Sequence, residues 1–188
     1  MKNSIDNLAR ALVMLRGIYS IKIKDIADIC GVSTTAINHH EKNKSKLSVN
    51  TFCTITKVYK ITPNRLSKVM YEQKKLTNSE ILICLKPKRE SQTIDPKFSV
   101  SRVAKLIRLL KNIPFNVTFS NDTEFRNRIT YASLNHIETL KSIPSVNTIK
   151  HICILYEISF DKYMYYAEKT ANMTTVDAAM FIAKDLSM

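Results

Sequence analysis

Two stretches of the chain carry the same polar side chains in the same order. Residues 32–66 and 129–163 align without a gap at an offset of 97, with twelve identities in thirty-five positions. The shared polar residues of the first stretch are Asn38, His39, Glu41, Lys44, Ser45, Ser48, Asn50 and Thr51. Amide, imidazole and hydroxyl groups form hydrogen bonds, and lysine ammonium groups bind anions. A period of this length indicates a duplicated module.

These side chains do not form a recognisable catalytic or metal site. Adjacent residues on a helix project about 100° apart, so His39 and His40 would not bind one metal ion. Gly17 and Gly31 are the only glycines, which excludes a glycine-rich phosphate loop. The histidine, glutamate and paired cysteines of a zinc deaminase are also missing. We therefore expect no catalytic residue, no metal and no cofactor.

The charge of the chain indicates a polyanionic partner. The net charge is +13, from 29 Lys and Arg against 16 Asp and Glu, which suits nucleic acid or an anionic membrane. Residues 1–70 carry twelve basic and four acidic residues (+8), whereas residues 99–188 carry eleven and eight (+3). No apolar run approaches the roughly 20 residues that span a bilayer, and the N-terminus has no signal-peptide pattern. We expect a cytoplasmic protein that does not enter membranes.

The four cysteines indicate reduced thiols. Cys30, Cys53, Cys84 and Cys153 lie far apart in the sequence and form no C-x-x-C pair. That spacing fits cytosolic thiols better than a disulfide framework or a zinc site. We expect Cys30, Cys53 and Cys153 to pack as small apolar side chains.

The repeated residues must be positioned by helices, because 45% of the residues are apolar and only two are glycine. Amphipathic spacing predicts helices over 6–18 and 24–30, and Gly31 is expected to end the second. Ser33 is expected to cap a third helix that runs to about Lys42. Ser48 or Asn50 should cap a fourth, and Thr62 with Pro63 should begin a fifth. The inward residues of the fourth helix would include Phe52, Ile55 and Val58 or Tyr59.

The second copy follows the first with changes near its start. A helix is predicted over 101–112, in which Val103, Leu106, Leu110 and Ile113 match Leu8, Ala11, Leu15 and Ile18 at an offset of 95. Two residues would then have been added before Ile129. The stretch 118–128 lacks the apolar pair and the turn glycine of the second helix, and Arg128 stands in the place of Gly31.

The predicted organisation is all-α, with two tandem modules. The first module spans residues 1–71 and the second spans 99–170. Residues 72–98 form a linker, in which the apolar run 81–85 is expected to make a short helix or strand packed on a domain. Residues 171–188 contain a C-terminal amphipathic helix over 175–186 that needs a partner surface.

The segment from Ile21 to Lys44 resembles the helix-turn-helix of the lambda-repressor-like (Cro/XRE-type) DNA-binding family. The residues at the family's spacing are Ala27, Gly31, Ser33, Ile37 and Glu41. The resemblance covers about 60 residues of the first copy and, more loosely, residues 101–166. It implies two tandem five-helix domains that bind double-stranded DNA. Two departures stand out, since Ile23 replaces a frequent Gln and His40 replaces an apolar residue.

The resemblance also implies which residues face DNA. In the first copy they are Ser33, Thr34, Thr35, Asn38 and His39, with Lys42, Lys44, Lys46, Ser48, Asn50 and Thr51 at or near phosphates. In the second copy they are Tyr131, Ala132, Ser133, Asn135, His136, Lys141, Ser145 and Asn147. Asparagine pairs with adenine and the threonine methyl meets the thymine methyl, so an A·T-leaning site is expected.

Two functions are compatible with these features. The first is a sequence-specific transcriptional regulator, a repressor or activator of bacterial or phage type, that reads two related half-sites from one chain. The alternative is an inhibitor or antitoxin-like adaptor whose N-terminal domain binds DNA for autoregulation while its second domain binds a protein partner or dimerises. A homodimer through the C-terminal helix or the second domain is compatible with both.

Overall fold

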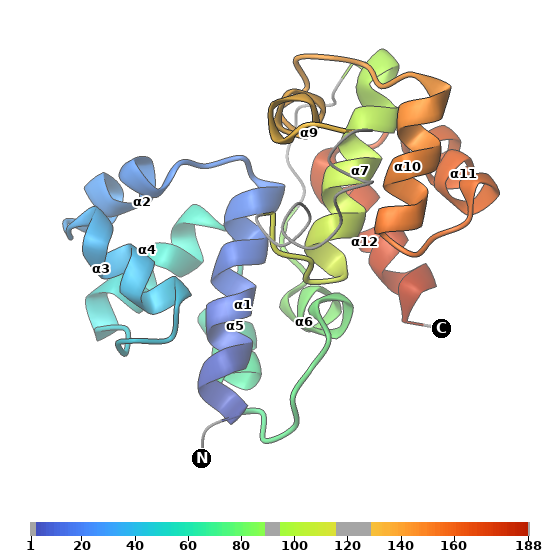
Figure 1. The fold of residues 1–188 in the computed structure, drawn as a ribbon. Helices are drawn as coiled ribbons and strands as arrows, with labels where there is room; N and C mark the ends of the chain where they lie inside the picture. The colour runs from blue at the N-terminus through green and yellow to red at the C-terminus, as the bar shows by residue number, and fades with distance from the viewer. Residues whose placement is uncertain (1–2, 89–94, 116–128, 188) are drawn as a thin grey trace. The chain divides into compact units, whose positions relative to one another are not determined.

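The computed structural model describes residues 3–88, 95–115 and 129–187. Within these ranges the regular elements are all helices and no strand occurs, which confirms the predicted all-α class (Figure 1). The chain divides into two compact units, residues 1–89 with 183–188 and residues 90–182. Each unit contains one copy of the repeated residues.

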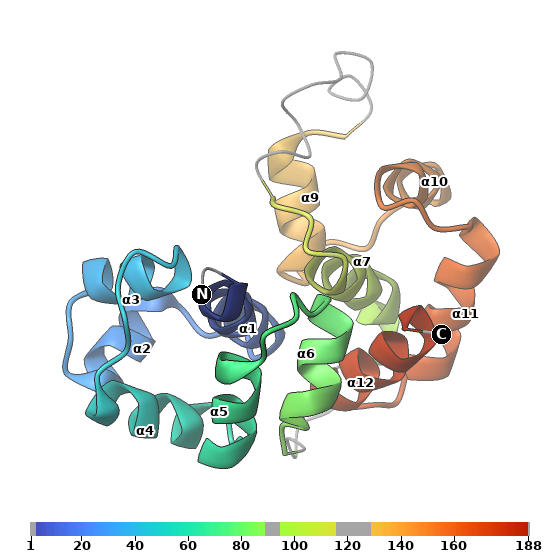
Figure 2. The same ribbon diagram turned by 90° about the horizontal axis from the view of Figure 1, so that it is seen from below.

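The first unit is built on a long N-terminal helix. Its helices are α1 (Asn3–Ile18), α2 (Ile23–Cys30), α3 (Thr34–Glu41), α4 (Val49–Val58), α5 (Pro63–Tyr71) and α6 (Asn78–Leu85). Helix α1 packs against α3, α5 and α6, and α2 packs against α3 and α4 (Figure 2). Leu15, Ile26, Ile37, Ile55 and Leu66 are buried between them. Of the residues predicted to face inward from α4, Ile55 and Tyr59 are buried, while Phe52 and Val58 are half-buried.

Local side-chain chemistry sets the helix ends. The Ser33 hydroxyl accepts the Ala36 N–H at 3.1 Å and begins α3. Of the two caps predicted for α4, Ser48 is the observed one, and its hydroxyl accepts the Thr51 N–H at 3.1 Å. These contacts satisfy backbone donors that have no partner within the helix. The predicted starts of α3 and α4 are therefore confirmed.

A three-residue turn joins α2 to α3. Gly31 has φ of 63°, the left-handed conformation, and its N–H donates to the Asp28 carbonyl at 3.2 Å. The Val32 N–H donates to the Ala27 carbonyl at 3.0 Å. This pattern closes a helix and redirects the chain, and glycine adopts it without the strain that a Cβ introduces.

Replacing Gly31 with alanine should lower the free energy of unfolding of the first unit by about 1 kcal/mol. A Cβ at this position would meet no atom within 4 Å, so the cost is conformational and not steric. Urea denaturation of the full chain measures it. Gly31→Asn is the control, because asparagine tolerates the left-handed region better than alanine. Equal stability of wild type and Gly31→Ala would contradict the assigned conformation.

The second unit repeats the packing of the first. Its elements are η1 (Pro96–Phe98), α7 (Ser99–Leu110), α9 (Tyr131–Glu138), α10 (Val146–Leu155), α11 (Phe160–Thr170) and, as far as Ile182, α12 (Thr175–Leu186). Helix α7 packs against α9 and α11, as α1 packs against α3 and α5. The segment 118–128, compared above with the second helix, lies outside the described residues.

The first helices of the two copies correspond at an offset of 92, so the predicted offset of 95 is wrong. Helix α1 ends at Ile18 and α7 ends at Leu110. Ser20 and Asn112 then both adopt a left-handed conformation, with φ of 55° and 57°. Apolar residues recur every three or four positions on a helix, so a shift of three keeps the stripe in place and conceals the error. The second copy is longer by five residues, not two, before Ile129.

The repeat extends beyond α5 and α11 to the next helix of each copy, α6 and α12. Helix α6 and helix α12 begin at the same offset of 97 as the other repeated helices. Thr77 accepts the Glu80 N–H at 3.1 Å, and Thr174 accepts the Asp177 N–H at 3.1 Å. The apolar run predicted to lie within the linker thus forms a helix packed against α1 and α5, and the predicted C-terminal helix is its counterpart.

Two arginines, the half-buried Arg10 and the buried Arg102, reinforce this correspondence. The Arg10 guanidinium donates to the carbonyl of Leu76, just before α6. The Arg102 guanidinium donates to the carbonyl of Met173 at 2.7 Å, just before α12. Arg10 and Arg102 are equivalent at the offset of 92, and the two carbonyls at the offset of 97. The same long-range contact therefore holds α6 in the first copy and α12 in the second.

The cysteines are all free thiols, but they do not share one environment. Cys153 is buried and Cys30 is half-buried, as expected for small apolar side chains. The prediction for Cys53 is wrong, because this residue lies on the exposed side of α4.

Alkylation with iodoacetamide at pH 8 should modify Cys53 well before Cys153. Burial raises the pKa of the Cys153 thiol to about 11, so little of the reactive thiolate is present at that pH. Peptide mapping by mass spectrometry reads the order of modification. Labelling in urea is the control, since both residues should then react. Equal rates in the native protein would contradict the burial of Cys153.

Candidate nucleic-acid interface

Helix α3 presents a polar face opposite its buried residue. Ile37 points into the core, whereas Thr34, Thr35 and His39 are exposed and Asn38 is half-buried. Ser33 is exposed as well, but its hydroxyl is already the acceptor that caps the helix. Of the five residues predicted on this helix and its cap, four therefore offer side chains to a partner.

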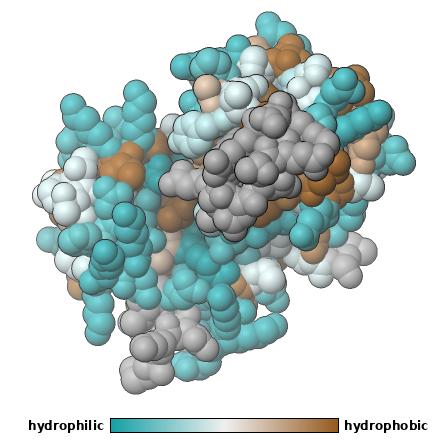
Figure 3. Space-filling model, in the orientation of Figure 1, coloured by the Kyte–Doolittle hydropathy of each residue, from teal (hydrophilic) through white to brown (hydrophobic). Residues whose placement is uncertain are grey.

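The loop from α3 to α4 adds positive charge beside this face. Lys42, Lys44 and Lys46 are exposed, and the Lys44 N–H donates to the His39 carbonyl at 2.7 Å. That bond and the left-handed Asn43, with φ of 57°, fold the loop back on the end of α3. On the face shown in Figure 3, hydrophilic residues cover most of the region of α2 to α4.

The start of α4 supplies part of the predicted contact set. Ser48 and Asn50 are exposed there. Thr51 is only 3% exposed, and its hydroxyl lies 2.8 Å from that of Ser48. The Thr51 side chain therefore completes the cap and packs inward, and the phosphate contact predicted for the start of α4 stays a prediction.

His40 forms polar contacts with the loop between α3 and α4. Its Nδ1 lies 2.9 Å from the Ser45 hydroxyl and 3.2 Å from the Ser45 carbonyl oxygen. Ile137, the equivalent residue of the second copy, is buried. His40 thus replaces an apolar contact with a polar one that ties the loop to α3.

A partly buried ion pair fixes α3 to α1. Arg16 donates to the two carboxylate oxygens of Glu41 from Nε at 2.6 Å and from a terminal nitrogen at 2.9 Å. The hydrogen bonds and charge of Glu41 raise the pKa of Arg16 above its ordinary value. A two-point pair between planar groups sets both distance and orientation. The end of α3 is thereby held against the long helix of the unit.

The second copy presents the corresponding residues on α9. Leu134 and Ile137 face the core. All eight predicted contact residues of this copy are exposed, namely Tyr131, Ala132, Ser133, Asn135, His136, Lys141, Ser145 and Asn147. The Lys141 N–H donates to the His136 carbonyl at 2.8 Å, which repeats the loop bond of the first copy.

The same ion pair recurs in the second unit, more deeply buried. Arg108 donates to Glu138 through two bonds of 2.6 Å each, and the Tyr156 hydroxyl donates to Glu138 at 3.2 Å. Burial lowers the pKa of Arg108, but the hydrogen bonds and charge of Glu138 outweigh it and the pKa is raised. Neither arginine was among the predicted functional residues. The available signal was an arginine in the last turn of each first helix.

The two candidate surfaces differ in charge. Thr139 and Ile143 stand in the second copy where Lys42 and Lys46 stand in the first. Ile143 is 54% exposed, so an apolar side chain occupies the surface in place of an ammonium group. The loop of the second copy therefore keeps one of three lysines.

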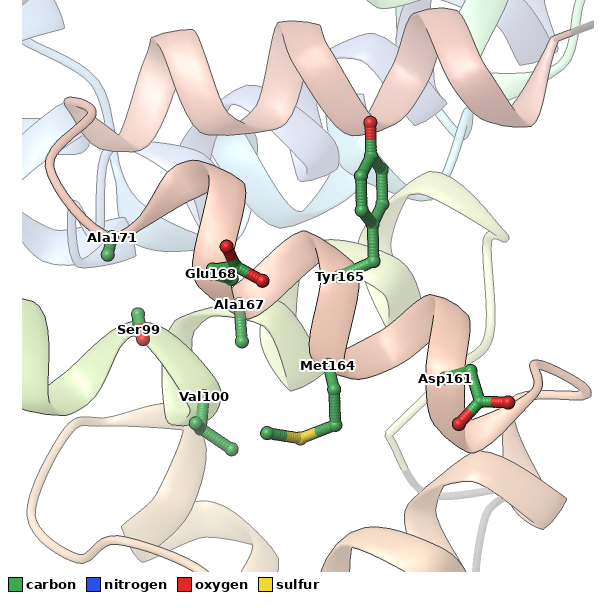
Figure 4. A pocket seen from close by; sticks show the side chains of 8 residues that line it. All are labelled: Ser99, Val100, Asp161, Met164, Tyr165, Ala167, Glu168 and Ala171. Carbon is green, nitrogen blue, oxygen red and sulfur yellow. The ribbon is translucent and has the colours of Figure 1, made fainter.

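A shallow groove lies elsewhere in the second unit, between α7 and α11. Its volume is about 600 Å³, and Val100 and Met164 point toward each other inside it (Figure 4). Asp161 and Glu168 also line it, while Tyr165 points away and its ring centroid lies 6.1 Å from that of Phe181. This mostly apolar groove contains none of the residues predicted to bind DNA.

The described residues bring together no three His, Cys, Asp or Glu side chains that could hold a metal ion. Among the helices of the described ranges, none is both long and apolar enough to cross a membrane.

Comparison with protein-family models, curated proteins and solved structures found no match for this chain.

Proposed function

We propose that this protein is a sequence-specific DNA-binding regulator of transcription that reads two related half-sites, one with α3 and one with α9. The observation that carries the proposal is the repetition of an exposed polar set on two equivalent helices. Asn38 with His39 and Asn135 with His136 occupy the same positions, and each helix is held by an Arg–Glu ion pair. These polar side chains are at least partly exposed and do not stabilise the core, so binding to a partner explains their repetition better than a role in folding does.

In this proposal α2, the turn at Gly31 and α3 act as a helix-turn-helix. The major groove of DNA accepts one helix, and residues at its N-terminal end reach base edges. Thr34, Thr35 and Asn38 lie at that end of α3 or one turn further on. The exposed lysines that follow suit phosphates, which position a protein without reading sequence.

The two halves of the DNA site should be related but unequal. Asparagine and histidine are common to both helices, whereas Thr34 is replaced by Tyr131 and two of three loop lysines are lost. Half-sites read by paired modules lie about one helical turn, or 34 Å, apart or at multiples of that distance. One chain would then supply both modules that separate subunits provide in a dimer.

A second function is favoured by the apolar surface of the second copy. Ile143 is exposed beside its single loop lysine, at the position that Lys46 occupies in the first copy. Exposed apolar residues with few charges are typical of the centre of a protein interface. An adaptor would use the first unit to bind DNA and this surface to bind a protein.

Selection from a random DNA library with the full chain, followed by footprinting, tests the regulator. Two matched variants separate the units, one with Asn38→Ala and His39→Ala, the other with Asn135→Ala and His136→Ala. Each should lose protection of one half of a bipartite site and keep the other half. Circular dichroism checks that both variants remain folded.

Three other outcomes have distinct meanings. Selection of no sequence by the wild type would refute DNA recognition by either unit. A site that the first variant loses entirely and the second variant binds as well as wild type would refute two reading helices and favour the adaptor. Protection that both variants retain would assign binding to another surface.

A further inference from the structure

One exposed side chain on the proposed reading surface is held in place. Tyr131, the first residue of α9, is 53% exposed. Its ring meets that of Phe115 edge to face, with centroids 4.7 Å apart and planes at 89°. This geometry is a favourable arrangement of two aromatic rings. The ring of Tyr131 is thus oriented although half of its surface faces solvent.

Phe115 in turn packs against Arg108, whose position is fixed by other contacts. The central guanidinium carbon of Arg108 lies 5.0 Å from the Phe115 ring centroid, within the range of a cation–π contact. Arg108 is bound to Glu138 and also donates to the Ile113 carbonyl at 3.2 Å. A continuous set of contacts therefore leads from the buried ion pair to the exposed ring.

The first copy has no equivalent of this arrangement. At the offsets of 92 and 97, Ile23 stands in the place of Phe115 and Thr34 in the place of Tyr131. The ion pair between Arg16 and Glu41 is present there, but neither Ile23 nor Thr34 carries an aromatic ring that could link it to the start of α3. The two copies thus share the Arg–Glu pair and differ in the residues that pack on it.

We propose that Tyr131 determines the specificity of the second half-site and that Phe115 is its positioning residue. The proposal rests on the DNA-binding function proposed above. A tyrosine ring extends further than threonine, and its hydroxyl both donates and accepts hydrogen bonds. Holding the ring before binding reduces the entropy lost when a base edge is contacted. The second half-site therefore differs from the first at the base pair read by the first residue of the helix.

Site selection with Tyr131→Thr in the full chain tests the specificity. The base preference of the second half-site should converge on that of the first at this position and stay unchanged elsewhere. Tyr131 is exposed, so this substitution leaves the core intact. Thr34→Tyr is the matched variant, and it should not reproduce the tyrosine preference in the first half-site, where Phe115 has no counterpart.

Phe115→Leu tests the positioning. It should weaken binding to DNA that carries the second half-site about three- to tenfold and leave binding to DNA that carries only the first half-site unchanged. Phe115→Tyr should restore wild-type binding. In a chain that already contains Tyr131→Thr, Phe115→Leu should have no further effect. A purely structural role would weaken binding equally in both backgrounds.

The outcomes separate this inference from the proposed function. A wild-type chain that selects no sequence overturns both. A bipartite site whose halves do not change with Tyr131→Thr overturns the inference and leaves the DNA-binding function in place. An effect of Phe115→Leu that persists in the Tyr131→Thr chain also overturns the inference and leaves the DNA-binding function in place.

Discussion

Replacing Glu138 with glutamine is expected to lower the free energy of unfolding of the second unit by about 3–5 kcal/mol. The substitution keeps the shape of the side chain and removes its charge, so the Arg108 guanidinium stays buried without a carboxylate. The Arg108 side chain is only 13% exposed, so water has little access to replace the lost carboxylate. Urea denaturation followed by circular dichroism measures the loss.

The first copy provides the matched comparison. Glu41→Gln removes the same negative charge from the partner of Arg16, whose side chain is 25% exposed, so the loss of stability should be smaller. A double variant, Arg108→Met with Glu138→Met, should recover much of the stability, because well-packed apolar groups avoid the cost of burying charge. A loss below about 1 kcal/mol for Glu138→Gln would show that the pair behaves as a surface ion pair.

The ion pairs explain why α3 and α9 keep their positions in both copies. Helices of eight residues are too short to be stable alone, so α3 and α9 depend on tertiary contacts. Ile37 and Leu134 bury one side of these helices, and the arginines fix their C-terminal ends. The exposed residues are free to change without loss of the fold, as the replacement of Thr34 by Tyr131 illustrates.

Features that depend on neighbouring residues were predictable from the sequence. The caps at Ser33 and Ser48 and the turn at Gly31 arise from contacts within five residues, and each was placed correctly. The constant offset of 97 also located α9 and α10, because the residues around these helices are identical at twelve positions. Local chemistry therefore determined most helix boundaries.

Features that depend on distant residues were not predictable. Arg16 and Glu41 are 25 residues apart in the sequence. The predicted offset of 95 for the first helix, in place of 92, also kept Arg16 from being aligned with Arg108. The correspondence between α6 and α12 escaped detection because Thr77 and Thr174 are the only identical residues at their start. Thr51 is buried because its hydroxyl packs against that of Ser48. Comparison of the two sequence copies does not show this, because it does not tell which side of the helix a residue occupies.

Replacing Lys42, Lys44 and Lys46 together with alanine is the second large expected effect. If each contacts one phosphate, the slope of log K against log salt should fall in magnitude by about 2.7, or about 0.9 for each contact. At 0.1 M salt that corresponds to about 500-fold weaker binding, taking the effect as zero at 1 M. Specific and non-specific DNA should be affected alike, because phosphate contacts carry no sequence information.

A control variant separates phosphate contacts from net charge. Alanine at Lys57, Lys60 and Lys68 removes the same three charges from exposed positions of α4, the following loop and α5. That variant should change the salt slope much less, since Debye screening limits charges more than about 10 Å from DNA at 0.1 M salt. Lys141→Ala then reports on the second copy, with an expected change of about 0.9 if its loop reaches a phosphate. Equal slopes for the two triple variants would assign DNA affinity to overall charge and remove the loop from the interface.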